Sequence, residues 1–267
     1  MHMKKHPSFI NILFISLFSF VNVSTASDIE REKMLADAIK DSIIIGDVVS
    51  LKAGDTEFIG LLNKETDVNP KGVALILHGM GSNPNAPQLI HPLRDNLAQY
   101  GWSTLAIQLP ILSHDAPMDD YIALVPESAP RIEASLNYLK ENFSNQPCTM
   151  IAHSLGAVMA INFLASKEGI SCDALVLIGL PTLPSKTDET NTIALLEKVK
   201  IPTLDIYGSQ DLPSVIQMAS TRKTILSKNS ALNRQQETQG ADHLFTGLSE
   251  PLALSIHSWL TNVTQQR

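Results

Sequence analysis

Short apolar runs alternate along the chain with segments whose apolar residues recur every three to four positions. Residues 28–40 have the helical spacing, and 43–51 and 57–63 predict two strands joined by a turn at Gly54-Asp55. Beyond them the predicted strands lie at 73–77, 104–109, 149–152, 174–178, 203–207 and 234–238, and the predicted helices at 90–100, 132–143, 157–165, 213–226 and from 249 onward. Strands that are apolar along their whole length are covered on both faces. The pattern therefore predicts an α/β protein with a mostly parallel central sheet and helices on both faces.

The N-terminal segment has the pattern of an export signal. Lys4 and Lys5 precede an apolar stretch at 9–23, which is shorter than the ~20 residues that a membrane-spanning helix needs. Ser24 and Ala26 then supply small residues at the positions that a signal peptidase requires. These features predict a signal peptide that is cut after Ala26, and the alternative is an uncleaved membrane anchor.

Length and charge narrow what the rest of the chain can be. Without residues 1–26, the chain at 27–267 is predicted to be a single domain with 18 basic and 27 acidic residues, and its net charge changes from −7 to −9. An acidic chain without a further run of lysine or arginine is not expected to bind nucleic acid. Two cysteines are too few for a disulfide scaffold or a zinc ribbon. We expect a periplasmic or secreted protein with no stable membrane span after cleavage.

A nucleophile motif follows the predicted strand at 149–152. Ligands of parallel sheets bind beyond the carboxyl ends of the strands, so these positions are the first to inspect. The segment Ala152-His153-Ser154-Leu155-Gly156 matches G-x-S-x-G with alanine in place of the first glycine. The motif places a serine on a sharp strand-to-helix turn, where small neighbours such as Gly156 let the backbones approach. The alternative is a serine that only caps a helix.

A glycine-rich turn, His78-Gly79-Met80-Gly81, follows the strand at 73–77. Gly79 and Gly81 let the chain turn sharply and expose a backbone N–H. Acyl transfer needs two N–H donors for the developing oxyanion, and the N–H groups of Met80 and Leu155 are the natural pair. The alternative is an ordinary turn between a strand and a helix, and His78 is interpreted as structural.

An acid and a base follow the last two predicted strands. Asp211 lies in the loop after 203–207, and His243 lies between the strand at 234–238 and the last helix. A carboxylate can orient such a histidine and stabilise its imidazolium. Asp205 is a rival acid inside the strand, Asp242 is another beside the histidine, and Asp211 could instead cap a helix. The order Ser154, Asp211, His243 is the order of the triad in one large enzyme fold.

The chain after the signal peptide resembles the α/β-hydrolase superfamily over nearly its whole length. The resemblance is carried by four segments, at 78–81, 152–156, 208–211 and 240–243. Asn85-Ala86-Pro87 and Gly101-Trp102-Ser103-Thr104 also resemble a family of uncharacterised exported bacterial proteins within it. The resemblance implies Ser154 as nucleophile, His243 as base, Asp211 as its orienting acid and the Met80 and Leu155 N–H groups as oxyanion donors. It implies no metal and no other cofactor. Ala152 departs from the usual glycine and implies a slightly roomier turn.

Two further features bear on the substrate mouth and on stability. The segment 180–201 has room for only one short helix, so a short cap is expected, and the longer excursion at 110–126 should border the mouth. The polar residues of that excursion are more typical of a solvated loop than of a metal site. Cys148 and Cys172 begin neighbouring strands at the opposite end of the sheet. They form a candidate disulfide in an exported protein, and the alternative is two buried thiols.

The sequence therefore predicts an exported serine hydrolase, carboxylesterase-like or lipase-like, that cleaves a carboxylic ester of a small-molecule or acyl substrate through an acyl-enzyme. An amidase, peptidase or thioesterase with the same triad is the first alternative. A non-catalytic binding or assembly factor that keeps the fold is the second.

Overall fold

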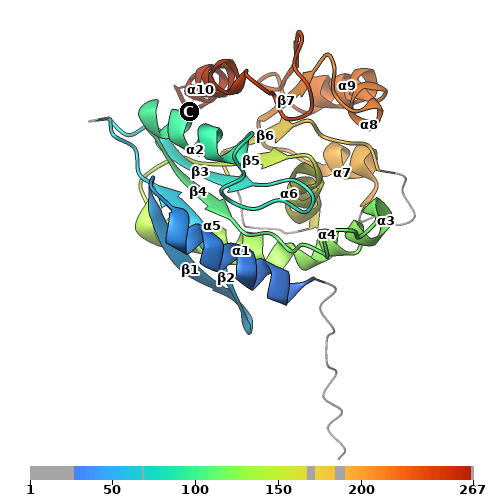
Figure 1. Ribbon diagram of the computed structural model, residues 1–267. Coiled ribbons are helices and arrows are strands. Elements are labelled where there is room, and N and C mark those ends of the chain that lie inside the picture. The colour runs from blue at the N-terminus through green and yellow to red at the C-terminus, as the bar shows by residue number, and fades with distance from the viewer. Residues whose placement is uncertain (1–26, 68, 167–171, 184–189, 266–267) are drawn as a thin grey trace, which may run out of the picture.

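A twisted central sheet organises the molecule (Figure 1). The computed structural model describes residues 27–67, 69–166, 172–183 and 190–265, so the predicted signal peptide lies outside the described residues. The described strands are β1 (Asp47–Ala53), β2 (Thr56–Asn63), β3 (Gly72–Leu77), β4 (Trp102–Ile107), β5 (Cys148–His153), β6 (Ala174–Ile178), β7 (Thr203–Gly208) and β8 (Arg234–Thr238). The helices are α1 (Ile29–Ser42), α2 (Ile90–Gln99), α3 (Met118–Tyr121), α4 (Leu124–Glu127), α5 (Ala129–Asn142), α6 (Leu155–Ser166), α7 (Thr192–Lys198), α8 (Pro213–Ile216), α9 (Ala219–Asn229) and α10 (Ser249–Gln265).

The order of the strands confirms the predicted α/β class. The sheet runs β1-β2-β4-β3-β5-β6-β7-β8. The β1–β2 hairpin and the β2–β4 pair are antiparallel, and every later pair is parallel. The carboxyl ends of β3, β5, β6, β7 and β8 therefore meet along one edge, and this edge carries the motif residues.

Helices cover both faces of the sheet, as the apolar strands require. Helices α2 and α10 pack on one face, while α5, α6 and α7 pack on the other (Figure 1). Alternate residues of each central strand feed the two cores, so that Leu75 and Leu77 belong to one and Ala74 and Ile76 to the other. None of the helices within the described ranges is long and apolar enough to cross a membrane.

Most elements start or end within three residues of their predicted bounds, and two differ more. Residues 43–46 precede β1 instead of starting it. The helix predicted at 213–226 is two helices, α8 and α9. Arg222 explains the break, because its guanidinium donates to the carbonyl oxygen of Val215 at 2.7 Å. In a continuous helix that carbonyl would accept from the backbone N–H four residues later.

The two cysteines lie where the sequence places them, at the start of β5 and just before β6. Both are free thiols, and their sulfur atoms are 3.4 Å apart. A hydrogen bond with Cys148 and burial together raise the pKa of the Cys172 thiol well above its ordinary value. A disulfide needs the sulfur atoms to close to about 2.0 Å. The candidate disulfide stays a prediction.

A buried ion pair fixes α9 to the sheet. Arg222 donates to the carboxylate of Asp205 at 2.8 Å, and both side chains are fully buried. Gln235 of the neighbouring strand donates to the same carboxylate oxygen at 2.8 Å. The Asp205 carboxylate therefore joins α9 to β7 and β8. Removal of Arg222 would leave this buried charge without its cation.

We expect Arg222→Met to lower the free energy of unfolding by about 3–5 kcal/mol, because an uncompensated buried carboxylate is strongly destabilising. Urea denaturation measures this change. Lys40→Met is the matched control, since Lys40 pairs with Asp37 at 3.2 Å on an exposed face and should change stability by less than about 1 kcal/mol. Equal losses in the two variants would contradict the assignment.

Candidate active site

Ser154 lies on a strained turn between β5 and α6. Its φ angle is 55°, in the left-handed region that residues other than glycine rarely adopt. The next residue but one, Gly156, lies so close to β3 that an added Cβ would stand 2.3 Å from the carbonyl oxygen of His78. Ala152, in place of the usual glycine, is fully buried in β5. The turn therefore lifts the serine side chain above the edge of the sheet and keeps its backbone tightly packed.

His243 connects the serine to an acid. Its Nε2 atom is 2.9 Å from the hydroxyl oxygen of Ser154, and its Nδ1 atom is 2.6 Å from a carboxylate oxygen of Asp211. The three residues come from the ends of β5, β7 and β8, which are far apart in the sequence. The structure thus brings together all three residues that the sequence singled out. With Nδ1–H donated to Asp211, the lone pair of Nε2 faces the serine O–H.

Asp211 is held as a carboxylate. Burial alone would raise its pKa, but the hydrogen bond and charge of His243 and the N–H groups of Leu212 and Gly208 outweigh burial, so the pKa is lowered. The Leu212 N–H donates at 2.7 Å and the Gly208 N–H at 3.3 Å. An ionised acid at this point can hold the imidazole in one orientation and stabilise its protonated form.

The two rival acids have other partners. Asp205 is paired with Arg222, as described above. Asp242 accepts hydrogen bonds from the backbone N–H groups of Leu244 and Thr246 at 3.0 and 2.9 Å. These contacts close the tight turn that carries His243.

The turn predicted to hold an oxyanion lies against the serine. A Cβ added to Gly79 would stand 3.2 Å from the Cβ of Ser154. Met80 is the next residue after Gly79, so its backbone also lies near the serine. Gly81 has a φ of 63°, which lets the chain turn away after Met80. Leu155 opens α6, and the first N–H groups of a helix have no acceptor within that helix. Both predicted donors thus belong to segments that border Ser154.

Two histidines support the site as neutral side chains. His153 is buried and donates from Nε2 to the backbone carbonyl of His243 at 3.0 Å. Burial, with the nearby His243, lowers the pKa of His153 to about 3. His78 accepts the N–H of Leu109 at 3.0 Å, and burial lowers its pKa to about 4. His78 therefore joins the ends of β3 and β4, in line with its structural interpretation.

Gly179 is a site residue that the sequence analysis missed. It directly follows β6 and has a φ of 57°, and an added Cβ would stand 3.0 Å from ring atoms of His243 and 3.3 Å from a carboxylate oxygen of Asp211. A side chain at position 179 would therefore press on the imidazole and its acid, and both would have to shift. The available signal was a glycine directly after the apolar strand that the sequence predicts at 174–178.

Exposed apolar side chains follow the site residues along the chain. Four of these side chains are 38–41% exposed, and three of the four are direct neighbours of Gly79, Asp211 or His243. They are Met80, Leu212, Ile216 and Leu244.

Two segments that were expected to border the substrate mouth contain short helices. The excursion at 110–126 holds α3 and most of α4, and α7 is the helix between β6 and β7. No group of three or more potential metal ligands occurs among the residues that the structure describes.

The strand order, the elbow at Ser154 and the loops that follow the strands define an α/β-hydrolase fold. The chain belongs to the family described as "Protein of unknown function (DUF3530)", whose model matches residues 23–130 and 123–242. A search of curated proteins finds no match.

Solved structures with the same fold include enzymes from several microbes. A dienelactone hydrolase from Anabaena variabilis is 23% identical, with a TM-score of 0.63, over 81% of this chain and 96% of its own. The esterase Pf2001 from Pyrococcus furiosus is 18% identical, with a TM-score of 0.66, over 84% and 93%. Est1E from Butyrivibrio proteoclasticus, solved with ferulic acid bound, is 15% identical, with a TM-score of 0.64, over 81% and 99%. At these identities the likeness establishes the fold.

Gly179→Ala should greatly slow the reaction of Ser154 with a fluorophosphonate probe, because the new methyl group would displace the ring of His243. Gly54→Ala is a matched control. Gly54 has nearly the same φ, 59°, but nothing within 4 Å of the added Cβ. Both variants should lose about 1 kcal/mol or more of stability from backbone strain, and only Gly179→Ala should lose reactivity. Equal labelling rates in the two variants would refute the role of Gly179.

Proposed function

We propose that the protein is an exported serine hydrolase that cleaves a carboxylic ester with Ser154, His243 and Asp211. The observation that carries the proposal is the continuous contact from the Ser154 hydroxyl to His243 Nε2 at 2.9 Å and from His243 Nδ1 to Asp211 at 2.6 Å. A hydroxyl in contact with an oriented base is the arrangement that nucleophilic catalysis requires. Export follows from the signal peptide predicted at 1–26, ahead of a single domain at 27–267.

In the proposed mechanism, the Ser154 oxygen attacks the carbonyl carbon of the ester while its proton moves to His243 Nε2. The carbonyl oxygen becomes an oxyanion, and the backbone N–H groups of Met80 and Leu155 donate to it. His243 then gives its proton to the departing alcohol, which leaves an acyl group on Ser154. Water attacks this acyl-enzyme with the help of the same histidine, and the carboxylic acid is released. Asp211 stabilises the imidazolium in both halves of the reaction.

The exposed apolar residues around the site favour a substrate with an apolar acyl group. Burial of each methylene against such side chains contributes about 0.8 kcal/mol to binding. The names of two structural relatives, an esterase and a dienelactone hydrolase, favour an ester over an amide or thioester. An amidase, peptidase or thioesterase would use the same residues, and a panel of leaving groups separates these classes. The lowered pKa of Asp211 and its contact with His243 argue against a non-catalytic factor.

Ser154→Ala should reduce hydrolysis of p-nitrophenyl butyrate to the uncatalysed rate and abolish fluorophosphonate labelling. Asp211→Asn should lower kcat by about 10⁴, because an amide cannot hold the productive tautomer of His243. Asp242→Asn is the control for the acid, since asparagine can keep the turn hydrogen bonds, and its activity should stay of the same order as wild type. An active Ser154→Ala variant would refute the nucleophile assignment.

The exposed apolar side chains beside the site residues generate a second prediction. The KM for p-nitrophenyl esters should fall as the acyl chain lengthens from acetate to octanoate, by up to about fourfold per buried methylene. Leu212→Ser should raise the KM for the octanoate and leave that for the acetate unchanged, since Leu212 is exposed and adjoins Asp211. Leu254→Ser is the matched control, because Leu254 is 52% exposed on α10 beside Gln236 and Trp259. A KM that is independent of chain length in the wild type would contradict an apolar acyl site.

A further inference from the structure

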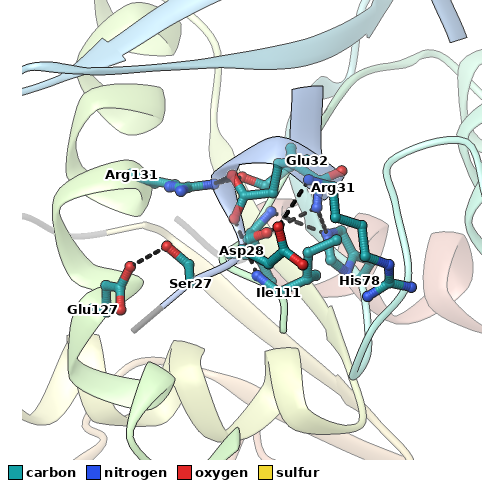
Figure 2. A network of polar contacts seen from close by, with 10 residues as sticks. Ser27, Asp28, Arg31, Glu32, His78, Ile111, Glu127 and Arg131 are labelled. Carbon is teal, nitrogen blue, oxygen red and sulfur yellow. Dashed lines mark hydrogen bonds and ion pairs between the residues drawn. The ribbon is translucent and has the colours of Figure 1, made fainter. Parts of the chain in front are cut away.

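The first turn of α1 contacts two separate parts of the molecule, the segment after β4 and α5 (Figure 2). The backbone N–H of Asp28 donates to the carbonyl of Ile111 at 2.7 Å, and the Ile111 N–H donates to the Glu32 carboxylate at 3.1 Å. Glu32 also accepts from Arg131 of α5 at 2.7 Å, and both side chains are buried. The start of α1 is thereby fixed to the segment after β4 and to α5.

This turn also reaches the predicted oxyanion turn. Arg31 donates from Nη2 to the carbonyl oxygen of Gly81 at 3.1 Å. Its Nη1 donates to the carbonyl oxygen of Leu112 in the excursion beyond β4. One guanidinium thus joins the glycine-rich turn beside Ser154 to the segment that follows β4, and its position depends on where α1 begins.

Ser27 lies immediately before this turn and is 9% exposed. Its hydroxyl donates to a carboxylate oxygen of Glu127, at the end of α4, at 2.5 Å (Figure 2). Burial, supplemented by the Glu127 carboxylate, raises the pKa of Glu32, although Arg131 opposes the rise. The carboxylate of Glu127 is in contact with Ser27 and acts on Glu32 as a like charge, so a positive charge added at Ser27 would lie beside an acidic group.

Ser27 is also the residue that cleavage after Ala26 would make the first of the chain. We propose that the new α-ammonium group of Ser27 pairs with the Glu127 carboxylate and so fixes α1, Arg31 and the oxyanion turn in the processed protein. The α-ammonium is then a positioning group for the proposed reaction, and the inference rests on the proposed cleavage and function.

The covalent geometry of serine limits the distance between the Ser27 nitrogen and the Glu127 carboxylate. The backbone nitrogen of a serine is three bonds from its hydroxyl oxygen, so the two atoms lie within about 4 Å of each other. Because the hydroxyl is 2.5 Å from Glu127, the Ser27 nitrogen lies at most about 6.5 Å from the Glu127 carboxylate, and opposite charges within about 4–6 Å act strongly on each other. A longer N-terminus would carry its ammonium about 3.5 Å further away for each added residue.

The test compares two chains released from a fusion partner by a protease that leaves a defined first residue. One begins at Ser27 and the other has Gly-Gly before Ser27. At pH 7 the chain that begins at Ser27 should have a Tm higher by about 2–4 °C and should react several-fold faster with a fluorophosphonate probe. In Glu127→Gln both differences should vanish. In Arg31→Gln the Tm difference should persist and the difference in labelling should vanish.

The pH dependence distinguishes the ammonium from a merely structural effect of chain length. Pairing with Glu127 raises the α-amino pKa above its ordinary value of about 7.7–8.0, so the Tm difference should be present at pH 7 and lost at high pH. Asp28, Arg31 and Glu32 of α1, Glu127 of α4 and Arg131 of α5 face the same place. Both chains carry these groups, so their own titration cancels in the difference.

Each outcome has one meaning. Equal Tm values and equal labelling rates, or a Tm difference that persists in Glu127→Gln, would overturn the inference. Exported full-length protein whose first residue is not Ser27, as measured by mass spectrometry, would also overturn it. A Tm difference without labelling of either chain would support the ion pair and refute the proposed function instead.

Discussion

The close approach of α6 to β3 is the constraint on which the rest of the site depends. Gly156 packs against the carbonyl of His78 at a distance that no side chain allows, and Ser154 accepts a left-handed conformation between strand and helix. Packing on both sides over-determines this strain, since β5 lies between β3 and β6 and is buried on both faces. Ser154, the proposed nucleophile, is therefore held by the core of the sheet, and His243 and Asp211 approach it from the ends of other strands.

The buried polar groups around the elbow divide into charged and neutral sets. Asp211 is ionised because N–H donors and the imidazole compensate its burial. His153 and His78 are kept neutral by burial, and each uses its ring to hold a backbone group near the site. A cation at position 153 would compete with His243 for the charge of Asp211, which acts on His153 as well. The low pKa values of these two histidines leave His243 as the proposed base for Ser154.

The N-terminal helix α1 lies outside the sheet, and its first turn contacts loops at the edge of the sheet that carries Ser154. Its first turn contacts the segment after β4, α5 and the glycine-rich turn after β3 through Asp28, Glu32 and Arg31. These contacts are polar and largely buried, so they depend on complete pairing. The start of α1, and hence the proposed processing site, is coupled in this way to the loop that carries Met80.

The sequence by itself determined the α/β class, the order of strands and helices, and the segments that hold Ser154, Asp211 and His243. It did so because apolar periodicity and glycine-containing turns depend on residues that are neighbours in the sequence, and not on how distant segments pack. The sequence favoured Asp211 and kept Asp205 as a rival, and only the fold shows that Arg222 pairs with Asp205 while His243 contacts Asp211. The fold also decided the role of Gly179, the split of α8 from α9, and the contact of Arg31 with Gly81. Each of these depends on residues distant in sequence that meet only when the sheet is assembled.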